Sequence, residues 1–400
     1  MITLALKSLD SKNWIFLSMN KLFIIITLFF YSTTLSLANP SVQARTAILV
    51  DYHSGEILFE LEPDAQIYPA SMTKIMTAIV AIDLIKKNKL SLNDQFTISE
   101  NAWRLSQAGY SSMFIMINDQ VSVEDLLKGI IIASGNDACV ALAEGIAGSE
   151  ENFAQMMNEK AIEIGMMSSN FTNASGINDP DNISTVRDIA LMSIHLIENY
   201  PDFYKIFKEK TFTWDRTGGD PIKQGNRNPL LYKNVGVDGV KTGYLAVEKY
   251  SLASSMIKND RRVIAVASGF ETKNSRSNES LKLLNWGFRN SNTFEISKKN
   301  SSIFEIETWL GKKNLIKASS KDDFYLTINK KDIRHLTVSI KYNGPVKAPI
   351  ANGEKVAELV VKKKDKVVKT IPLYSTEDLK KVNFFKSLLT SLNYLIWGDV

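Results

Sequence analysis

The stretch RTAILVDYHSGEILFE, residues 45–60, has two β-favouring runs on either side of a glycine turn and predicts an antiparallel hairpin that turns at Gly55. Ser71 then opens a helical run in which Ile75 and Ile79 recur on one face. The fold therefore begins with two strands and a helix.

Helical stretches dominate from about residue 90 to 290, and strand-like segments return near the end of this region. The helical stretches include residues 123–132, 137–146 and 279–289, and the strand-like segments are residues 235–242, 251–257 and 263–268. Strands at both ends with helices between them predict one α/β domain whose sheet joins the two ends.

From about residue 293 the composition changes to short β-type pieces separated by Asn, Asp, Gly and Pro. This pattern predicts a small all-β domain, a β-sandwich, over residues 293–375. Residues 376–400 are predicted to contain an amphipathic helix, whose apolar side carries Val382, Phe385, Leu389, Leu392 and Ile396. Such a helix lies in the headgroup plane of a membrane, or it docks onto the β domain.

Residues 1–38 have the features of a secretory signal peptide. Lys21 precedes an apolar run at residues 22–31, and the small-residue tripeptide Ser36-Leu37-Ala38 follows it. The run is short for a membrane span, which needs about 20 residues, although an uncleaved anchor is an alternative. We expect export, with Met19 as a second candidate start of translation.

The chain has one cysteine, Cys139, and three histidines without ligand spacing, so no intramolecular disulfide forms and neither a metal nor another cofactor is expected. Residues 297–400 carry 20 Lys or Arg against 11 Asp or Glu, a net charge of +9, whereas the whole chain is only +5. Given export, blocks such as residues 362–364 suit an anionic membrane better than nucleic acid, and an ordinary solvated lysine face is the alternative.

Three short patterns occur in a meaningful order: Ser71-Met72-Thr73-Lys74, Ser134-Gly135-Asn136 and Lys241-Thr242-Gly243. Singly, the first two are weak, since S-x-x-K also occurs at Ser18 and Ser255, whereas K-T-G occurs once. The order of the three patterns along the chain and their surrounding sequence make the set informative about function.

These residue types suit nucleophilic acyl transfer. A serine hydroxyl is a poor nucleophile unless a neighbouring base removes its proton. Because Ser71 begins a helix, Lys74 lies one turn along the same face, within reach of the serine oxygen. A lysine becomes such a base when desolvation or a nearby cation, here Lys241, lowers its pKa. The small Gly243 lets a substrate backbone lie along its strand.

The motif set resembles that of penicillin-binding proteins and class A β-lactamases, and most closely that of low-molecular-mass D-alanyl-D-alanine carboxypeptidases. The resemblance also covers residues 45–60, the SGNDACVALAE segment at residues 134–144, the β-rich tail and the C-terminal helix. It implies an α/β fold in which a β-lactamase/DD-peptidase-like catalytic domain, an antiparallel sheet with a helical cluster over residues 39–292, precedes the small all-β domain and the amphipathic helix.

The family pattern implies catalytic roles for three residues. Ser71 would be the nucleophile, Lys74 its general base, and Ser134 the relay that passes protons to the leaving amine. The residues implied in substrate binding are Asn136, Lys241, Thr242, Gly243, Tyr244 and Arg276. In the family, an oxyanion hole is formed by two backbone N–H groups, here those of Ser71 and Tyr244.

One position departs from the family. Close relatives often have a histidine directly before the glycine of the segment at residues 173–177, whereas this chain has Ser175. The contribution of that histidine to deacylation or loop order is therefore in question here.

The resemblance implies a serine carboxypeptidase that removes the terminal D-alanine from peptidoglycan stem peptides ending in D-Ala-D-Ala and that binds β-lactams covalently. It would be periplasmic and attached to the outer face of the inner membrane through its C-terminal helix. A β-lactamase is disfavoured because no E-x-x-L-N motif lies between Asn136 and Lys241. A non-catalytic wall scaffold is the third interpretation, and no nucleic-acid partner is expected.

Overall fold

The computed structural model describes residues 40–177, 179–215, 219–301 and 304–398. The predicted signal peptide lies outside these residues.

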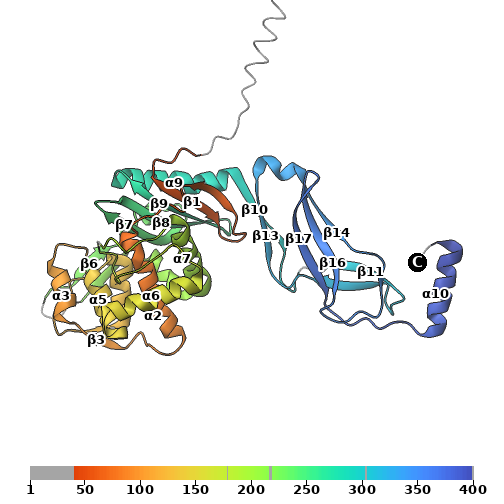
Figure 1. Cartoon of the computed structure of the whole chain (residues 1–400), viewed down its shortest axis with the longest axis horizontal. Coiled ribbons are helices and arrows are strands. Elements are labelled where there is room, and N and C mark those ends of the chain that lie inside the picture. Colours follow the sequence, from red (N-terminus) through yellow and green to blue (C-terminus); the bar gives the residue numbers. More distant parts are fainter. Residues whose placement is uncertain (1–39, 178, 216–218, 302–303, 399–400) are drawn as a thin grey trace, which may run out of the picture. The chain divides into compact units, whose positions relative to one another are not determined.

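A five-stranded antiparallel sheet joins the two ends of the α/β domain (residues 42–290) in the order β2-β1-β9-β8-β7 (Figure 1). Its strands are β1 (Thr46–Asp51), β2 (Ile57–Leu61), β7 (Val237–Leu245), β8 (Lys249–Lys258) and β9 (Arg261–Phe270). The pairing of β1 with both β2 and β9 confirms the hairpin and the sheet that the sequence predicts.

Side chains of β1 enter two different cores, because a strand directs successive residues to opposite faces. Ala47 and Leu49 belong to the core beneath α9 (Lys273–Asn290), whereas Ile48 and Val50 belong to the core of the helical cluster. Helices therefore cover both faces of the sheet, and every residue of β1 is buried.

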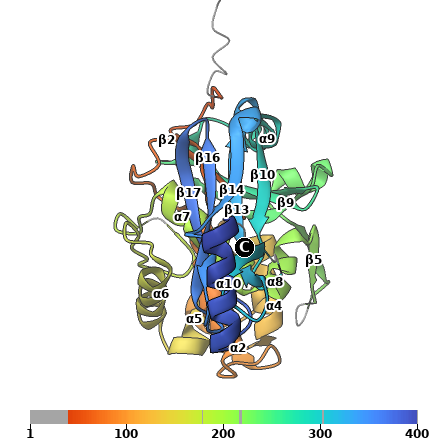
Figure 2. The ribbon, with the colours of Figure 1, turned by 90° about the vertical axis from the view of Figure 1, so that its right-hand side faces the viewer.

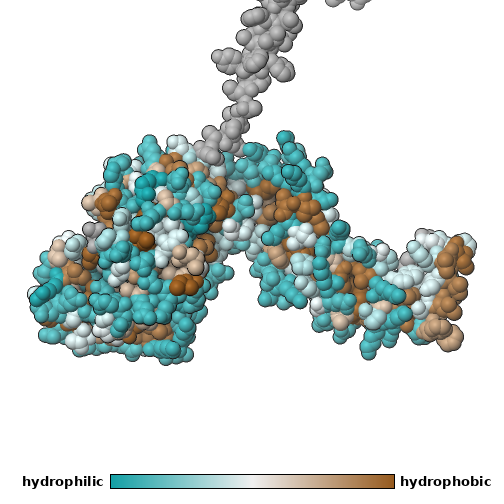
Figure 3. All heavy atoms as spheres, in the orientation of Figure 1, coloured by the Kyte–Doolittle hydropathy of each residue, from teal (hydrophilic) through white to brown (hydrophobic). Residues whose placement is uncertain are grey.

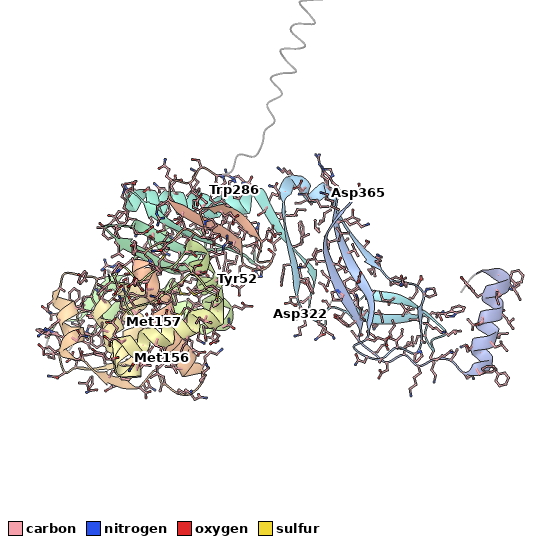
Figure 4. All side chains as sticks on the ribbon, viewed as in Figure 1. Tyr52, Met156, Met157, Trp286, Asp322 and Asp365 are labelled. Atoms are coloured by element: carbon pink, nitrogen blue, oxygen red, sulfur yellow. The ribbon has the colours of Figure 1, made fainter. Side chains whose placement is uncertain are left out.

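The helical cluster packs around α2, which is buried from Lys74 to Ile82. Its elements are η1 (Ala70–Thr73), α2 (Lys74–Lys86), α3 (Glu100–Gln107), α4 (Val123–Lys128), η2 (Gly129–Ala133), α5 (Asn136–Ala147), α6 (Glu150–Ile164), α7 (Val186–Asn199), α8 (Pro201–Tyr204), η3 (Lys205–Lys208) and η4 (Pro229–Lys233). Met157 of α6, labelled in Figure 4, is buried in this core. The sequence did not suggest two small two-stranded antiparallel sheets, which are β3 (Gln95–Thr97) with β4 (Gln120–Ser122), and β5 (Thr211–Trp214) with β6 (Ile222–Gly225).

The β domain that follows contains a six-stranded sheet in the order β14-β16-β17-β12-β11-β15 and the pair β10-β13. The bounds are β10 (Ser291–Ser297), β11 (Phe304–Trp309), β12 (Leu315–Ser319), β13 (Phe324–Asn329), η5 (Lys330–His335), β14 (Leu336–Lys341), β15 (Val346–Lys347), β16 (Lys355–Lys363) and β17 (Lys366–Ser375). Figure 2 shows β14, β16 and β17 side by side, and the buried residues of the six-stranded sheet form a core of their own.

The C-terminal helix α10 (Phe384–Trp397) begins later than the predicted boundary at residue 376. The intervening residues still belong to the β domain, because Leu379 is buried in its core and bridges to Ile350. Large apolar side chains of α10, among them Phe385, are exposed and form the brown band on this helix in Figure 3. Within the described part of the chain, no helix combines the length and the apolar character that crossing a bilayer requires.

Candidate active site

The sequence-predicted site residues meet at one cavity of about 1140 Å³ in the α/β domain. Its walls include Ser71, Ser134, Asn136, Thr242, Gly243, Tyr244 and Arg276. The other two predicted residues, Lys74 and Lys241, are buried and hydrogen-bonded to Ser71 and Ser134 respectively. The structure thus brings together residues that are up to 205 positions apart, from 71 to 276.

Lys74 is the centre of the hydrogen-bond network. It is the first residue of α2, one turn after Ser71 in η1. Its Nζ lies 3.0 Å from Ser71 Oγ, 2.6 Å from Asn136 Oδ1 and 2.6 Å from the carbonyl oxygen of Ser175. The ammonium form can donate to all three acceptors.

Burial lowers the pKa of Lys74 from its ordinary value of 10.5, and the nearby acidic groups Asp137 and Glu150 oppose that change only in part. The neutral amine has two N–H donors and one lone pair. It can donate to Asn136 Oδ1 and the Ser175 carbonyl while its lone pair accepts the Ser71 hydroxyl proton. The geometry therefore suits a base directed at Ser71.

Ser134 is held by the second lysine. Lys241 Nζ donates to Ser134 Oγ at 2.8 Å, and Ser134 itself has a φ of 63°, a left-handed conformation that costs a non-glycine residue energy. Burial and then the positive charge of Lys74 set the pKa of Lys241 well below its usual range. The serine hydroxyl therefore has a fixed donor and a fixed position at the cavity wall.

The third motif passes close to the start of the serine-bearing helix. A Cβ atom at Gly243 would lie 2.9 Å from the carbonyl oxygen of Pro69 and 3.4 Å from Ala70 Cβ, so only glycine fits without displacement. Strand β7 is at the edge of the sheet, so its outer side has no partner strand among the described residues of that sheet. Such an edge accepts an extended peptide as an added strand.

Two arginines contribute positive charge to the lining of the cavity. Arg276 on α9 lies with its guanidinium 5.5 Å from the Tyr250 ring centre, and its Nε has no hydrogen-bond partner among the described residues. Arg227 also lines the cavity, and its Nε donates to the carbonyl oxygen of Ala133 at 3.4 Å. Arg227 was not among the residues predicted from the sequence, although the lack of any acidic residue between Asp220 and Asp238 was a weak signal that it has no local partner.

Ser175, the departure from the family pattern, contributes its backbone rather than its side chain. Lys74 bonds to the Ser175 carbonyl, whereas the Ser175 hydroxyl donates to Asn173 Oδ1 within the same loop. The next residue, Gly176, has a φ of +75°, and a Cβ there would lie 1.9 Å from the carbonyl oxygen of Ala70. Replacing histidine by Ser175 therefore leaves the contact to Lys74 in place.

Cys139 is fully buried on α5, and its thiol donates to the carbonyl oxygen of Gly135 at 3.2 Å. Burial raises the pKa of this thiol to about 12, so it is protonated and unreactive at neutral pH. Among the described residues no group of three or more His, Cys, Asp or Glu side chains is placed to hold a metal ion.

Comparison with known proteins identifies the family. Residues 33–272 match the model of peptidase family S11, which is described as D-alanyl-D-alanine carboxypeptidase. The chain belongs to this family. Residues 292–381 match the C-terminal domain of penicillin-binding protein 5, so the family assignment extends through the β domain. The chain is accordingly a hydrolase and a peptidase, as its motifs suggested.

Two curated relatives in this family cover most of the chain. D-alanyl-D-alanine carboxypeptidase DacA of Haemophilus influenzae is 39% identical over 87% of this chain and 88% of its own. DacC of Escherichia coli is 39% identical over 86% of both chains. The crystal structure of penicillin-binding protein 5 from H. influenzae superposes with a TM-score of 0.77 at 38% identity and covers 86% of this chain and 99% of that one. The fold class that the sequence predicts is thereby confirmed.

Proposed function

We propose that this D-alanyl-D-alanine carboxypeptidase family member removes the terminal D-alanine from peptidoglycan stem peptides through an acyl-enzyme on Ser71. The observation that carries the proposal is the buried Lys74 amine, which is bonded at once to Ser71 Oγ, Asn136 Oδ1 and the Ser175 carbonyl. A lysine held in this way is pre-positioned to take the serine proton without rearrangement.

In the first step, Ser71 Oγ attacks the carbonyl carbon between the last two D-alanines while Lys74 accepts its proton. The developing oxyanion is stabilised by the backbone N–H groups of Ser71 and Tyr244, donors that in acyl transfer are each worth about 3–4 kcal/mol. Ser134, held by Lys241, relays to the departing amine the proton that Lys74 took from Ser71. The terminal D-alanine then leaves, and Lys74 is a neutral amine again.

In the second step, water attacks the ester carbon of the acyl-enzyme, and Lys74 again accepts the proton. The shortened peptide then leaves and Ser71 regains its proton. A β-lactam would enter by the same first step, but its ring-opened product stays attached to Ser71. Solved relatives from Listeria monocytogenes in ampicillin-bound and cefotaxime-bound forms, 27% and 28% identical over 63% of this chain, support this expectation.

The test is to measure D-alanine release from a stem pentapeptide and, in parallel, intact mass after penicillin is added. Steady D-alanine release together with one long-lived penicillin adduct supports the proposal. An adduct that is lost within seconds while penicillin is consumed would instead indicate a β-lactamase. If neither D-alanine release nor a penicillin adduct is observed, the wall-scaffold interpretation would remain.

Arg276 is proposed to bind the terminal carboxylate of the substrate, because its guanidinium is buried beside the cavity and its Nε has no partner among the described residues. We expect Arg276→Ala to raise KM for the stem peptide by about 10- to 100-fold, the effect of losing one charge-assisted hydrogen-bond pair. Arg289→Ala is the matched control, because Arg289 is an exposed arginine in the last turn of the same helix. Equal KM values for the two variants would contradict the role of Arg276.

We also propose export and peripheral attachment of the chain to the membrane through α10, with anionic lipid as the partner of its exposed apolar side and its lysine-rich surroundings. We expect the full mature chain to sediment with anionic lipid vesicles and a chain that ends at Val382 to remain in the supernatant. Ending at Val382 retains the buried Leu379, so the β domain keeps its core. Sedimentation of the shortened chain would place the membrane contact elsewhere.

A further inference from the structure

Behind the cavity, one buried carboxylate accepts five hydrogen bonds. Asp137, in the first turn of α5, is fully buried. Its Oδ1 accepts from the backbone N–H groups of Met113 (2.8 Å) and Ala138 (2.9 Å), and its Oδ2 accepts from Ser112 Oγ (2.6 Å) and the N–H groups of Phe114 (2.8 Å) and Ile115 (3.2 Å). Four of these five donors come from one segment, residues 112–115.

The segment that Asp137 holds, residues 112–115, directly follows a wall of the cavity. Residues 109–111, directly before it, line the cavity, and the exposed ring of Tyr110 belongs to them. The carbonyl oxygen of Ser111 accepts from the N–H of Asn136 at 2.8 Å. Residues 109–115, called the wall segment below, therefore line the cavity at one end, bond to the second motif through Ser111 and bond to the Asp137 carboxylate through residues 112–115.

The same carboxylate lies directly against that motif. A Cβ atom at Gly135 would lie 2.8 Å from Asp137 Oδ1 and 2.9 Å from the backbone nitrogen of Met113. Gly135 is therefore enclosed between the carboxylate and the wall segment. Its neighbour Ser134 is the residue with the strained φ of 63°. Strain of this kind persists only where the surroundings fix the backbone.

We propose that Asp137 is a positioning residue that joins the wall segment, residues 109–115, whose first three residues line the cavity, to the Ser134-Gly135-Asn136 motif. One carboxylate then sets both the surface that receives the stem peptide and the orientation of the Ser134 hydroxyl. The proposal rests on the function proposed above, because its effect is on acylation of Ser71. Asp137 itself makes no contact with substrate.

The substitution Asp137→Asn tests this arrangement with almost no change in volume. It replaces one carboxylate oxygen by an NH₂ group, which would then face at least two N–H or O–H donors. Donors left without an acceptor in a buried site are unfavourable, so the wall segment should separate from the motif. The full mature chain is used, and the reagent is a labelled penicillin.

We expect the acylation rate per titratable serine to fall by about 10²-fold, the loss typical of a reacting group displaced by roughly 1 Å. Both the limiting acylation rate and the half-saturating penicillin concentration should change, because Asp137 positions both the Ser134 hydroxyl and the cavity wall. Amide exchange at Met113, Phe114 and Ile115 should become faster. Ser112→Ala removes one of the five donors to Asp137, and the acceptor that Ser112 Oγ offers to the Phe114 N–H, and should lower the rate by about two- to tenfold.

Two controls separate positioning from a general loss of stability. Asp119→Asn alters another buried carboxylate of the same region, which has one oxygen unpaired among the described residues, and should leave the rate within about twofold of the parent. Leu283→Ala creates a cavity in the core beneath α9 and should lower Tm while the rate per titratable serine is unchanged.

An acylation rate of Asp137→Asn equal to that of the parent would overturn the proposal. An equal loss of rate in Leu283→Ala, at the same Tm as Asp137→Asn, would also overturn it. If Asp137→Asn does not fold, unchanged acylation and unchanged amide exchange in Ser112→Ala overturn it. Failure of the unaltered chain to form any adduct would refute the proposed function instead, and the amide-exchange comparison would still test whether Asp137 holds the wall.

Discussion

Ser71→Ala is expected to abolish both D-alanine release and the covalent penicillin adduct. Within the described part of the chain no other hydroxyl is bonded to Lys74, so the variant has no replacement nucleophile at the base. The loss in kcat should be on the order of 10⁶-fold, as is typical when a catalytic serine is removed. Intact mass spectrometry and D-alanine release measure the two effects on the same sample.

The chain provides a matched control for this substitution in its second S-x-x-K pattern among the described residues. Ser255 and Lys258 have the same spacing as Ser71 and Lys74, but they lie on strand β8. Ser255 is buried and accepts from Arg262 rather than from a lysine. Ser255→Ala should acylate normally. An adduct on Ser71→Ala, or its absence from Ser255→Ala at equal stability, would refute the assignment of the nucleophile.

Lys74→Met is expected to lower the acylation rate by about 10²–10⁴-fold, the contribution usual for a positioned general base. Methionine is of similar length and fills the buried site, but it cannot accept the Ser71 proton. The Asn136 Oδ1 atom and the Ser175 carbonyl also lose their donor. Stopped-flow measurement of penicillin acylation gives the rate directly.

Lys160→Met is the control for loss of a buried lysine. Lys160 on α6 is also buried but bonds to Asp83 and Glu163, outside the cavity. Its substitution should affect stability without affecting the acylation rate per titratable serine. Similar rate losses in the two variants would mean that the effect of Lys74 is structural, and the base would have to be another group.

Much of this site follows from the sequence because its chemistry is concentrated in short local patterns. The S-x-x-K spacing has catalytic meaning only on a helix, where residues i and i+3 share a face. Ser71 is followed by helical periodicity, whereas Ser255 lies in a strand-like pattern. The sequence alone therefore shows which of these two S-x-x-K patterns can be catalytic. The strands at both ends of the α/β domain were similarly visible, since β-favouring residues cluster there.

Features that depend on distant segments were not predictable in this way. Arg227 becomes a cavity residue only because the chain just before η4 packs beside the Ser134 motif, and Asp137 stands out only through donors that come from residues 112–115. The boundary at residue 376 was placed before the end of the β domain, because nothing in the local sequence shows that Leu379 is buried in that domain's core, and α10 itself begins only at Phe384. Local composition cannot separate a core residue from a residue on an amphipathic surface.

The contact between Lys74 and the Ser175 carbonyl has a consequence for how this enzyme can diverge. Any L-amino acid offers the same carbonyl, so position 175 is free to drift during evolution as long as its side chain fits. Position 176 has no such freedom, because a Cβ there would collide with the Ala70 carbonyl. Across natural variants we therefore expect a tolerant residue followed directly by an invariant glycine.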